Sequence, residues 1–268
     1  MSIFPEMFGP LNESILKKAQ KKELIELNLV NFRNYAYSKH KNVDDYPYGG
    51  GAGMVLKPEP IFEAVKALPV QGKAKIILMS PQGEVFNQEL ARELAVQQEL
   101  VFICGHYEGF DERIRLLADL QLSIGDYVLT GGELGAMVVI DAVARLIPGV
   151  LGEEQSAQDD SFSSGFLEYP QYTRPPVYDS MHVPEVLLSG DHAKVGLWRR
   201  KEALRRTLLK RPDIFNSSIL QAEDFPLLRE LMEEEPRIVE LSHLWLQFEP
   251  PLKPKRAKKI RRDPVEQE

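Results

Sequence analysis

Residues 123–133 read SIGDYVLTGGE, and this stretch guides the interpretation of the first half of the chain. It places Gly125, Gly131 and Gly132 around a short apolar pair, and a strongly apolar segment, 134–147, follows at once. Glycine allows backbone conformations that other side chains forbid, so such a loop can pass close to a ligand. Where the loop opens a helix, it also presents unpaired N–H donors. The stretch therefore predicts a small-molecule pocket rather than a simple surface turn.

Two short apolar runs lie upstream of this loop. They are residues 74–80 (AKIILMS) and 100–105 (LVFICG), and the segment between them, 87–98, has the pattern of a helix. Strand–helix–strand spacing of this kind predicts an α/β fold with a parallel, buried sheet. Residues 58–68 and 132–146 are predicted to form further helices, the second stopped by Pro148 and Gly149.

In an open parallel sheet, ligands bind beyond the carboxyl ends of the strands. Here those ends are followed by the loops 80–83 (SPQG) and 105–109 (GHYEG). Both loops contain glycine, as does the stretch 123–133. We expect the three to meet in one crevice.

The composition changes after residue 152. Residues 153–165 (EEQSAQDDSFSSG) are polar and small, as in a linker, and 169–177 (YPQYTRPPV) is too rich in proline to be helical. From Gly196 the pattern is helical, interrupted by Pro236. The predicted organisation is an α/β domain over 1–152, a flexible linker over 153–168, a helical domain over 169–248 and a basic disordered tail over 249–268.

Charge is segregated along the chain. The net charge of −7 argues against a nucleic-acid partner, yet residues 194–211 carry eight Lys or Arg side chains against one acid, Glu202, and the tail 253–262 (KPKRAKKIRR) has no acid. Local basic surface decides whether phosphates are held. A solvated helix face with a disordered tail remains the alternative explanation.

The cysteine count and the missing sequence motifs exclude several classes of functional site. A single cysteine, Cys104, leaves no internal disulfide and no cysteine-clustered metal site, and favours a reducing cytosol. Neither a membrane-length apolar run nor a signal peptide is visible. The run 49–54 (GGGAGM) has the wrong spacing for a dinucleotide loop, and no P-loop or serine nucleophile elbow occurs. The five histidines lack metal-ligand spacing, and His106 alone sits in a strand-end loop.

A few charged residues remain as chemical candidates. Glu108 and Asp126 lie in the glycine loops, whereas Asp159 and Asp160 lie in the predicted linker. The latter pair is either exposed in a turn or belongs to a linker that orders over a ligand and supplies a general base. Arg145 interrupts an otherwise apolar helix, where it either pairs with a structural acid or points into a site.

Eight ordered segments carry a resemblance to a known family. The chain resembles the bacterial tRNA (guanine-N1)-methyltransferases of the SPOUT class over nearly all of residues 3–215. The segments are DDYPYGGGAGM (44–54), SPQG (80–83), CGHYEGFDER (104–113), SIGDYVLTGGEL (123–134), DAVARLIPGVLG (141–152), DSF (160–162), PQYTRP (170–175) and VPEVLLSGDH (183–192).

The resemblance implies a fold and a reaction. The fold would be a parallel α/β sheet with a deep trefoil knot, a rare topology, followed by a small helical domain that helps hold tRNA. The protein would be a cytoplasmic homodimer with its active site at the subunit interface. The reaction would move a methyl group from S-adenosylmethionine to N1 of the guanosine just 3′ of the anticodon, when another guanosine precedes it. A non-catalytic RNA-binding protein that kept the fold is the alternative.

The resemblance also implies roles for individual residues. Asp160 would be the general base and Arg145 its supporting cation. Methyl transfer in the family is linked to a magnesium ion, but no ligand cluster in the sequence locates one. The donor pocket would be built from the three strand-end loops by Met79, Ser80, Pro81, Gly105, Tyr107, Glu108, Ile124, Gly125, Tyr127, Val128, Leu129, Gly131 and Gly132.

The chain departs from the family at three places. It opens MSIFPEMF, where the family has several more apolar residues, so either the first strand is shortened or the true start lies upstream. Gly135 replaces a usual proline, which predicts a slightly looser start of the helix. Residues beyond about 216 extend past the family core; disorder of the basic tail is favoured over a weak RNA contact.

Overall fold

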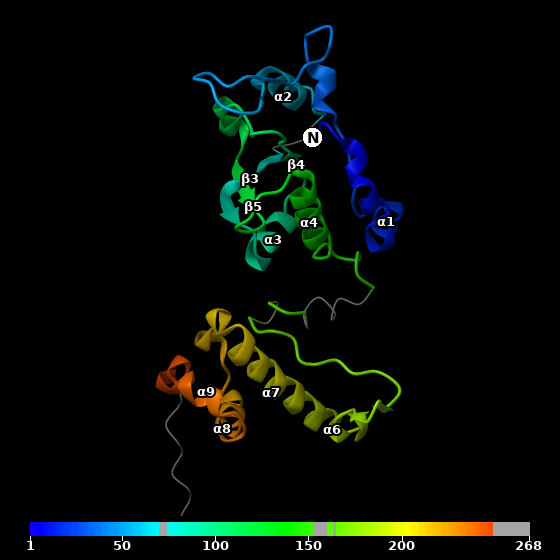
Figure 1. The fold of residues 1–268 in the computed structure, drawn as a ribbon. Helices are drawn as coiled ribbons and strands as arrows, with labels where there is room; N and C mark the ends of the chain where they lie inside the picture. Colours follow the sequence, from blue (N-terminus) through cyan, green and yellow to red (C-terminus); the bar gives the residue numbers. More distant parts are fainter. Residues whose placement is uncertain (70–73, 153–159, 163–164, 249–268) are drawn as a thin grey trace, which may run out of the picture. The chain divides into compact units, whose positions relative to one another are not determined.

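The computed structural model describes residues 1–69, 74–152, 160–162 and 165–248. Its contacts divide the chain into two compact units, Met1–Asp159 and Asp160–Glu268. Figure 1 shows both units. The division falls within the stretch 153–168 that the composition marks as a linker. The exact domain limits stay a prediction.

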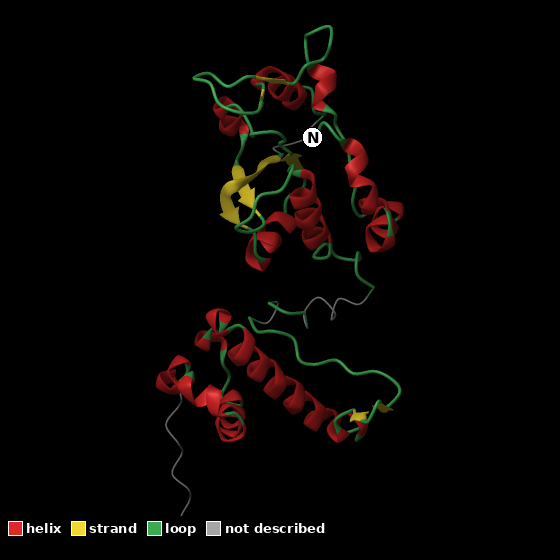
Figure 2. Cartoon of the chain, in the orientation of Figure 1, coloured by secondary structure: helices red, strands yellow, loops and turns green. Residues whose placement is uncertain are grey.

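A three-stranded parallel sheet forms the centre of the first unit (Figure 2). β3 (Lys75–Val85) lies between β4 (Leu100–Ile103) and β5 (Leu120–Ser123). α3 (Gln88–Ala95) connects β3 to β4, which confirms the predicted strand–helix–strand unit. The sequence did not predict β5, because four residues of which two are polar give no distinct apolar run.

The predicted end of the first strand was wrong. We expected a loop after Ser80, but β3 continues to Val85. Met79 and Glu84 both pair with Leu122, so residues 80–83 bulge out of the ladder between two paired parts of one strand. A side chain on Gly83 would collide with the backbone of β5 at Leu122. The extension depends on a partner strand about forty positions away, which no local pattern reveals.

Helices cover both faces of this sheet. Alternation along β3 points Ile77 and Met79 into one cluster with residues of α3 and α4 (Glu133–Ala144), and α3 packs on α4. Leu78 points the other way, into a cluster with Ile61 of α2 (Pro58–Lys66). α2, α3 and α4 begin within one residue of the predicted positions and end two or three residues earlier.

Shorter elements complete the first unit. The amino-terminal segment forms η1 (Pro5–Asn12), α1 (Ser14–Lys21) and η2 (Phe32–Tyr35). β1 (Asp44–Asp45) and β2 (Val55–Leu56) pair antiparallel around the glycine run 49–53, and η3 (Glu112–Leu117) precedes β5. None of the helices in the described parts of the chain is both long and apolar enough to cross a bilayer.

The second unit is helical, as predicted. A small hairpin of β6 (Val177–Tyr178) and β7 (Met181–His182) precedes α6 (Glu185–Leu188), and the long α7 (His192–Lys210) follows. Then come η4 (Pro212–Ile214), η5 (Ser217–Ile219), α8 (Asp224–Glu234), α9 (Pro236–Glu240), η6 (Ser242–Leu244) and η7 (Leu246–Phe248). Leu204, Leu208 and Trp245 lie in its core.

α7 begins four residues before the predicted start. The Asp191 side chain caps it by accepting a hydrogen bond from the backbone N–H of Lys194 at 3.1 Å. Aspartate is a common N-cap residue, but the sequence analysis did not use Asp191 to place the start of the helix. Pro236 begins α9, in agreement with the predicted interruption.

Ion pairs neutralise much of the basic face expected on α7. The Lys201 ammonium contacts Glu230 at 2.8 Å and Glu234 at 2.7 Å, both on α8. Arg200 forms two hydrogen bonds of 2.8 Å with Asp224. The charge pattern of residues 194–211 alone therefore overstates the basic surface of α7, because acids of α8 pair with several of its cations.

Candidate functional site

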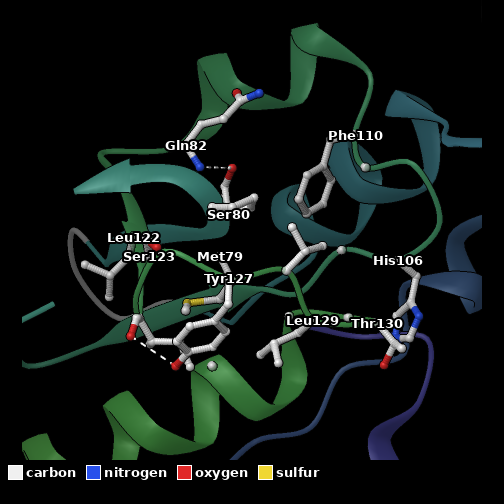
Figure 3. A pocket seen from close by; sticks show the side chains of 18 of the residues that line it. Met79, Ser80, Gln82, His106, Phe110, Leu122, Ser123, Tyr127, Leu129 and Thr130 are labelled. Carbon is white, nitrogen blue, oxygen red and sulfur yellow. Dashed lines mark hydrogen bonds between the residues drawn. The ribbon is translucent and has the colours of Figure 1, made fainter. Parts of the chain in front are cut away.

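The loops beyond the sheet line one cavity of about 200 Å³. Figure 3 shows its side chains, among them Met79, Tyr127 and Leu129. Every residue predicted to bind the donor lies in its wall: Met79, Ser80, Pro81, Gly105, Tyr107, Glu108, Ile124, Gly125, Tyr127, Val128, Leu129, Gly131 and Gly132. The structure thus brings the three stretches together, while their binding role stays a prediction.

Two of the stretches meet through their backbones. The N–H of Gly132 donates to the carbonyl of Gly105 at 2.9 Å, and His106 forms an isolated antiparallel bridge with Gly131. A Cβ on Gly132 would lie 2.9 Å from the Cα of Cys104, closer than real side chains approach. Glycine at this position is therefore a requirement of close chain passage.

The turn after β5 is shaped by its own polar groups. The backbone N–H of Gly125 donates to Ser123 Oγ at 3.2 Å, and Gly125 has a φ of +145° that other residues rarely adopt. Tyr127 folds back so that its hydroxyl donates to the Ile124 carbonyl at 3.2 Å. Val128 at the tip remains 84% exposed, so an apolar side chain is left open beside the cavity.

An arginine that sequence analysis missed supports the first loop. Arg115 Nη1 donates to Ser80 Oγ at 3.4 Å and also to the side chain of Gln121. Ser80 Oγ in turn accepts from the backbone N–H of Gln82 at 3.2 Å (Figure 3). Nothing in the sequence distinguishes Arg115 from Arg113, whose side chain pairs with Asp111 outside the cavity wall.

Glu108 joins the glycine run 49–53 to the same region. Its backbone N–H donates to the Met54 carbonyl at 3.0 Å, and its side chain occupies the space that a side chain on Gly53 would need. The run that fails as a dinucleotide loop therefore lies beside the cavity. Asp126, the other acid considered in these loops, does not line it.

A buried carboxylate lies behind the wall, and sequence analysis did not identify it. Glu133, the first residue of α4, is fully buried, with Oε2 2.9 Å from His106 Nε2. Its Oε1 accepts a hydrogen bond from the hydroxyl of Ser2. Ser2 and Glu133 are 131 positions apart. The only sequence signal was the placement of His106 in a strand-end loop.

The two predicted catalytic residues belong to different units. Arg145 directly follows α4, at its C-cap, and is partly buried in the first unit; Asp160 is partly buried at the start of the second. Each takes part in polar or ring interactions within the structure. Their approach to one another stays a prediction, and Asp159 lies outside the described residues.

The second unit has a cavity of its own, of about 310 Å³. It is lined in part by Tyr169, Tyr172, His192 and Arg199. The Arg199 guanidinium lies 4.8 Å from the centre of the Tyr169 ring, in cation–π geometry. Such a combination of aromatic faces and a cation suits a nucleobase and its phosphate.

A resident metal centre has no support within the described ranges. No group of three or more His, Cys, Asp or Glu side chains there is placed to hold an ion.

Comparison with known proteins gives a consistent family assignment. A family model described as tRNA (Guanine-1)-methyltransferase TrmD matches residues 1–217. A protein of Desulfitobacterium hafniense (strain Y51) named tRNA (guanine-N(1)-)-methyltransferase is 62% identical over 259 residues, covering 96% of this chain and 98% of that protein. Proteins of the same name from Staphylococcus carnosus (strain TM300) and Dictyoglomus turgidum (strain DSM 6724 / Z-1310) are 60% and 54% identical, covering 85% and 87% of this chain and 94% and 96% of their own lengths.

Proposed function

The chain belongs to the tRNA (guanine-N1)-methyltransferase family of the SPOUT class, and we propose that it methylates N1 of the guanosine immediately 3′ of the anticodon. The methyl donor is S-adenosylmethionine, and the preferred tRNAs carry another guanosine just before the target. The observation that carries the proposal is the strand-end cavity, whose wall contains all the residues that the family resemblance assigns to the donor.

The chemistry of this wall suits adenosine. The loops present apolar side chains and glycine backbone, with few charges: Met79, Ile124 and Leu129 supply the apolar part. A flat base can be held between such side chains while backbone N–H and C=O groups recognise its edge. Gly105 and Gly132 let the loops approach closely, because neighbouring protein atoms already occupy the space that a Cβ at either position would need.

Asp160 and Arg145 supply the reactive charges in this account. Guanine N1 holds a proton at neutral pH, so its lone pair is not available for attack. The Asp160 carboxylate removes that proton as a general base. The Arg145 guanidinium stabilises the negative charge that spreads onto O6. The donor supplies a methyl group already activated on a sulfonium, so the protein's remaining task is to align the three atoms.

A homodimer would complete the site, with the helical unit of one subunit serving the cavity of the other. Leu134 and Val138 support this arrangement, because they are one turn apart on α4 and are 46% and 49% exposed. A trefoil knot is part of the proposal, as the family resemblance implies, and the tight passage of Gly132 against Cys104, just after β4, supports it. The family resemblance also implies a magnesium requirement, and loss of methyl transfer on chelation tests it.

RNA would be held by the second unit. The rings of Tyr169 and Tyr172 beside Arg199, which line the cavity of this unit, offer stacking and a phosphate contact. Because the target guanine must leave its stack to reach the donor, such stacking would stabilise the splayed anticodon loop. A cytoplasmic location is part of the proposal, because tRNA is the proposed substrate.

The test separates binding from chemistry. Asp160→Asn should lower the rate of methyl transfer to an anticodon stem-loop by at least about a hundredfold, with donor affinity unchanged. Asp179→Asn, in the exposed turn between β6 and β7, serves as the matched control. Retained turnover in Asp160→Asn would remove it as the base. Binding of tRNA without any affinity for the donor would instead indicate a non-catalytic RNA-binding protein.

A further inference from the structure

A chain of hydrogen bonds runs behind the donor cavity. The backbone N–H of Phe4 donates to Ser2 Oγ at 2.8 Å, and the Ser2 hydroxyl donates to Glu133 Oε1. Glu133 Oε2 lies 2.9 Å from His106 Nε2. A carboxylate with no exposed surface is costly unless its oxygens are hydrogen-bonded. Here both oxygens have partners, and the amino-terminal end of α4 adds a favourable dipole.

His106 faces the cavity on one side and this carboxylate on the other. It lines the cavity wall beside Thr130, and Figure 3 labels both side chains. The Phe4 ring packs edge-on against the imidazole with 4.7 Å between ring centres. Donation to the carboxylate requires the proton on Nε2. The imidazole is therefore held from two sides, by a ring and by a carboxylate.

The wall residue Gly131 lies directly over this pair. Any side chain on Gly131 would collide with both His106 Nε2 and Glu133 Oε2. The two side chains thus occupy the space beneath the backbone that carries Thr130 and Gly132 into the cavity wall. Movement of the pair would change the position of that backbone.

We propose that His106 and Glu133 form a positioning pair that fixes residues 130–132 of the donor cavity against the loop that follows β4. The inference rests on the proposed function, since it predicts that donor affinity depends on the hydrogen bond between them. Neither residue touches the transferred methyl group in this account, so the chemical step itself is little affected.

The decisive comparison uses two substitutions of one residue. His106→Phe keeps a ring against Phe4 but removes the donor, whereas His106→Gln keeps an N–H that can reach the carboxylate. For His106→Phe we expect the Kd for S-adenosylmethionine, measured by calorimetry without tRNA, to rise about tenfold, with kcat at saturating donor within about twofold of the starting value. For His106→Gln the Kd for S-adenosylmethionine should be within about threefold of that of the unaltered protein. His40→Gln, at an exposed position of the same unit, is the control.

The outcomes separate this proposal from the one on which it rests. If the unaltered protein binds the donor and His106→Phe binds it with the same Kd, the positioning pair is overturned, whereas the proposed function stands. A fall in kcat with no change in donor affinity would also overturn it. If the unaltered protein binds no donor, both proposals fail. If His106→Phe does not fold, Ser2→Ala replaces it, because this change removes the hydrogen bond to Glu133 Oε1 from outside the cavity wall. A raised donor Kd in Ser2→Ala supports the pair, and an unchanged Kd overturns it.

Discussion

The backbone N–H of Gly132 donates to the carbonyl oxygen of Gly105 at 2.9 Å, so the third loop of the cavity ends directly against the second. Gly132→Ala would place a Cβ 2.9 Å from the Cα of Cys104 and 3.0 Å from the Cβ of Met79. Backbone cannot yield as a flexible side chain can, so the loop itself must move. We expect at least a tenfold loss of donor affinity, measured by calorimetry.

Gly9→Ala provides the control for that substitution. Gly9 lies in η1, and nothing is within 4 Å of where its Cβ would be. Donor affinity should be unchanged there. Equal affinities for both alanine variants would contradict the requirement for close passage at Gly132.

A buried ion pair should contribute much of the stability of the second unit. Asp224 is 2% exposed and accepts two hydrogen bonds from Arg200 and one from the backbone N–H of Gln221, each of 2.8 Å. Asp224→Ala leaves these donors without their acceptor, so the free energy of unfolding should fall by about 2–3 kcal/mol. Trp198 and Trp245, the only tryptophans of the chain, both lie in this unit, so their fluorescence during urea unfolding reports on it.

The exposed ion pair on the same helix makes a useful contrast. Glu230 contacts Lys201 but is 57% exposed, and solvent screens such pairs. Glu230→Gln should cost less than about 1 kcal/mol. A cost equal to that of Asp224→Ala would show that burial is not what makes the Arg200 pair important.

Glu234 should make the second unit sensitive to acid. Hydrogen bonds from Lys201 and then Arg205 hold the pKa of Glu234 below its ordinary value of 4.5. A carboxyl group whose pKa is lowered by folding stabilises the fold above its ordinary pKa, and that stability is lost as the pH falls through the lowered value. The stability difference between the unaltered protein and Glu234→Gln, followed by tryptophan fluorescence, should therefore be constant near neutrality and shrink below about pH 4.5. A difference independent of pH down to about pH 2 would contradict this.

Cys104 offers a chemical probe of the first unit. The side chain is fully buried, and burial raises the pKa of its thiol to about 12. Because the thiolate is the reactive form, the folded protein should resist iodoacetamide at about pH 8 and react once urea unfolds it. S-adenosylmethionine should slow the reaction further by stabilising the folded state. Rapid alkylation of the folded protein would contradict the burial of Cys104, because it would show that the reagent reaches the thiol without unfolding.

The cavity was predictable because its determinants are local. Each predicted loop follows an apolar run or contains several glycines, and parallel strands bring their carboxyl ends to one edge of the sheet. That rule placed Ser80 and Gly105 together, and the glycines of the stretch 123–133 led us to expect Gly125 beside them. The identity of the donor came from the family resemblance, since glycines and apolar side chains do not specify a ligand.

The features that the sequence could not predict depend on contacts between residues far apart in the chain. Glu133 is ordinary as an acid at the start of a helix, and only the fold reveals that Ser2 and His106 bury it. The continuation of β3 beyond Ser80 likewise requires β5 as its neighbour. The pairing of α7 cations with acids of α8, as between Lys201 and Glu234, likewise depends on how the two helices pack.

Mass analysis of the modified nucleoside tests the central claim most directly. A tRNA with guanosines at the last anticodon position and just after it is incubated with the protein and S-adenosylmethionine carrying a deuterated methyl group. We predict labelled 1-methylguanosine just 3′ of the anticodon, and none when the preceding guanosine is replaced. Label on another base, at another position, or on no nucleoside of a tRNA that the protein binds would contradict the account.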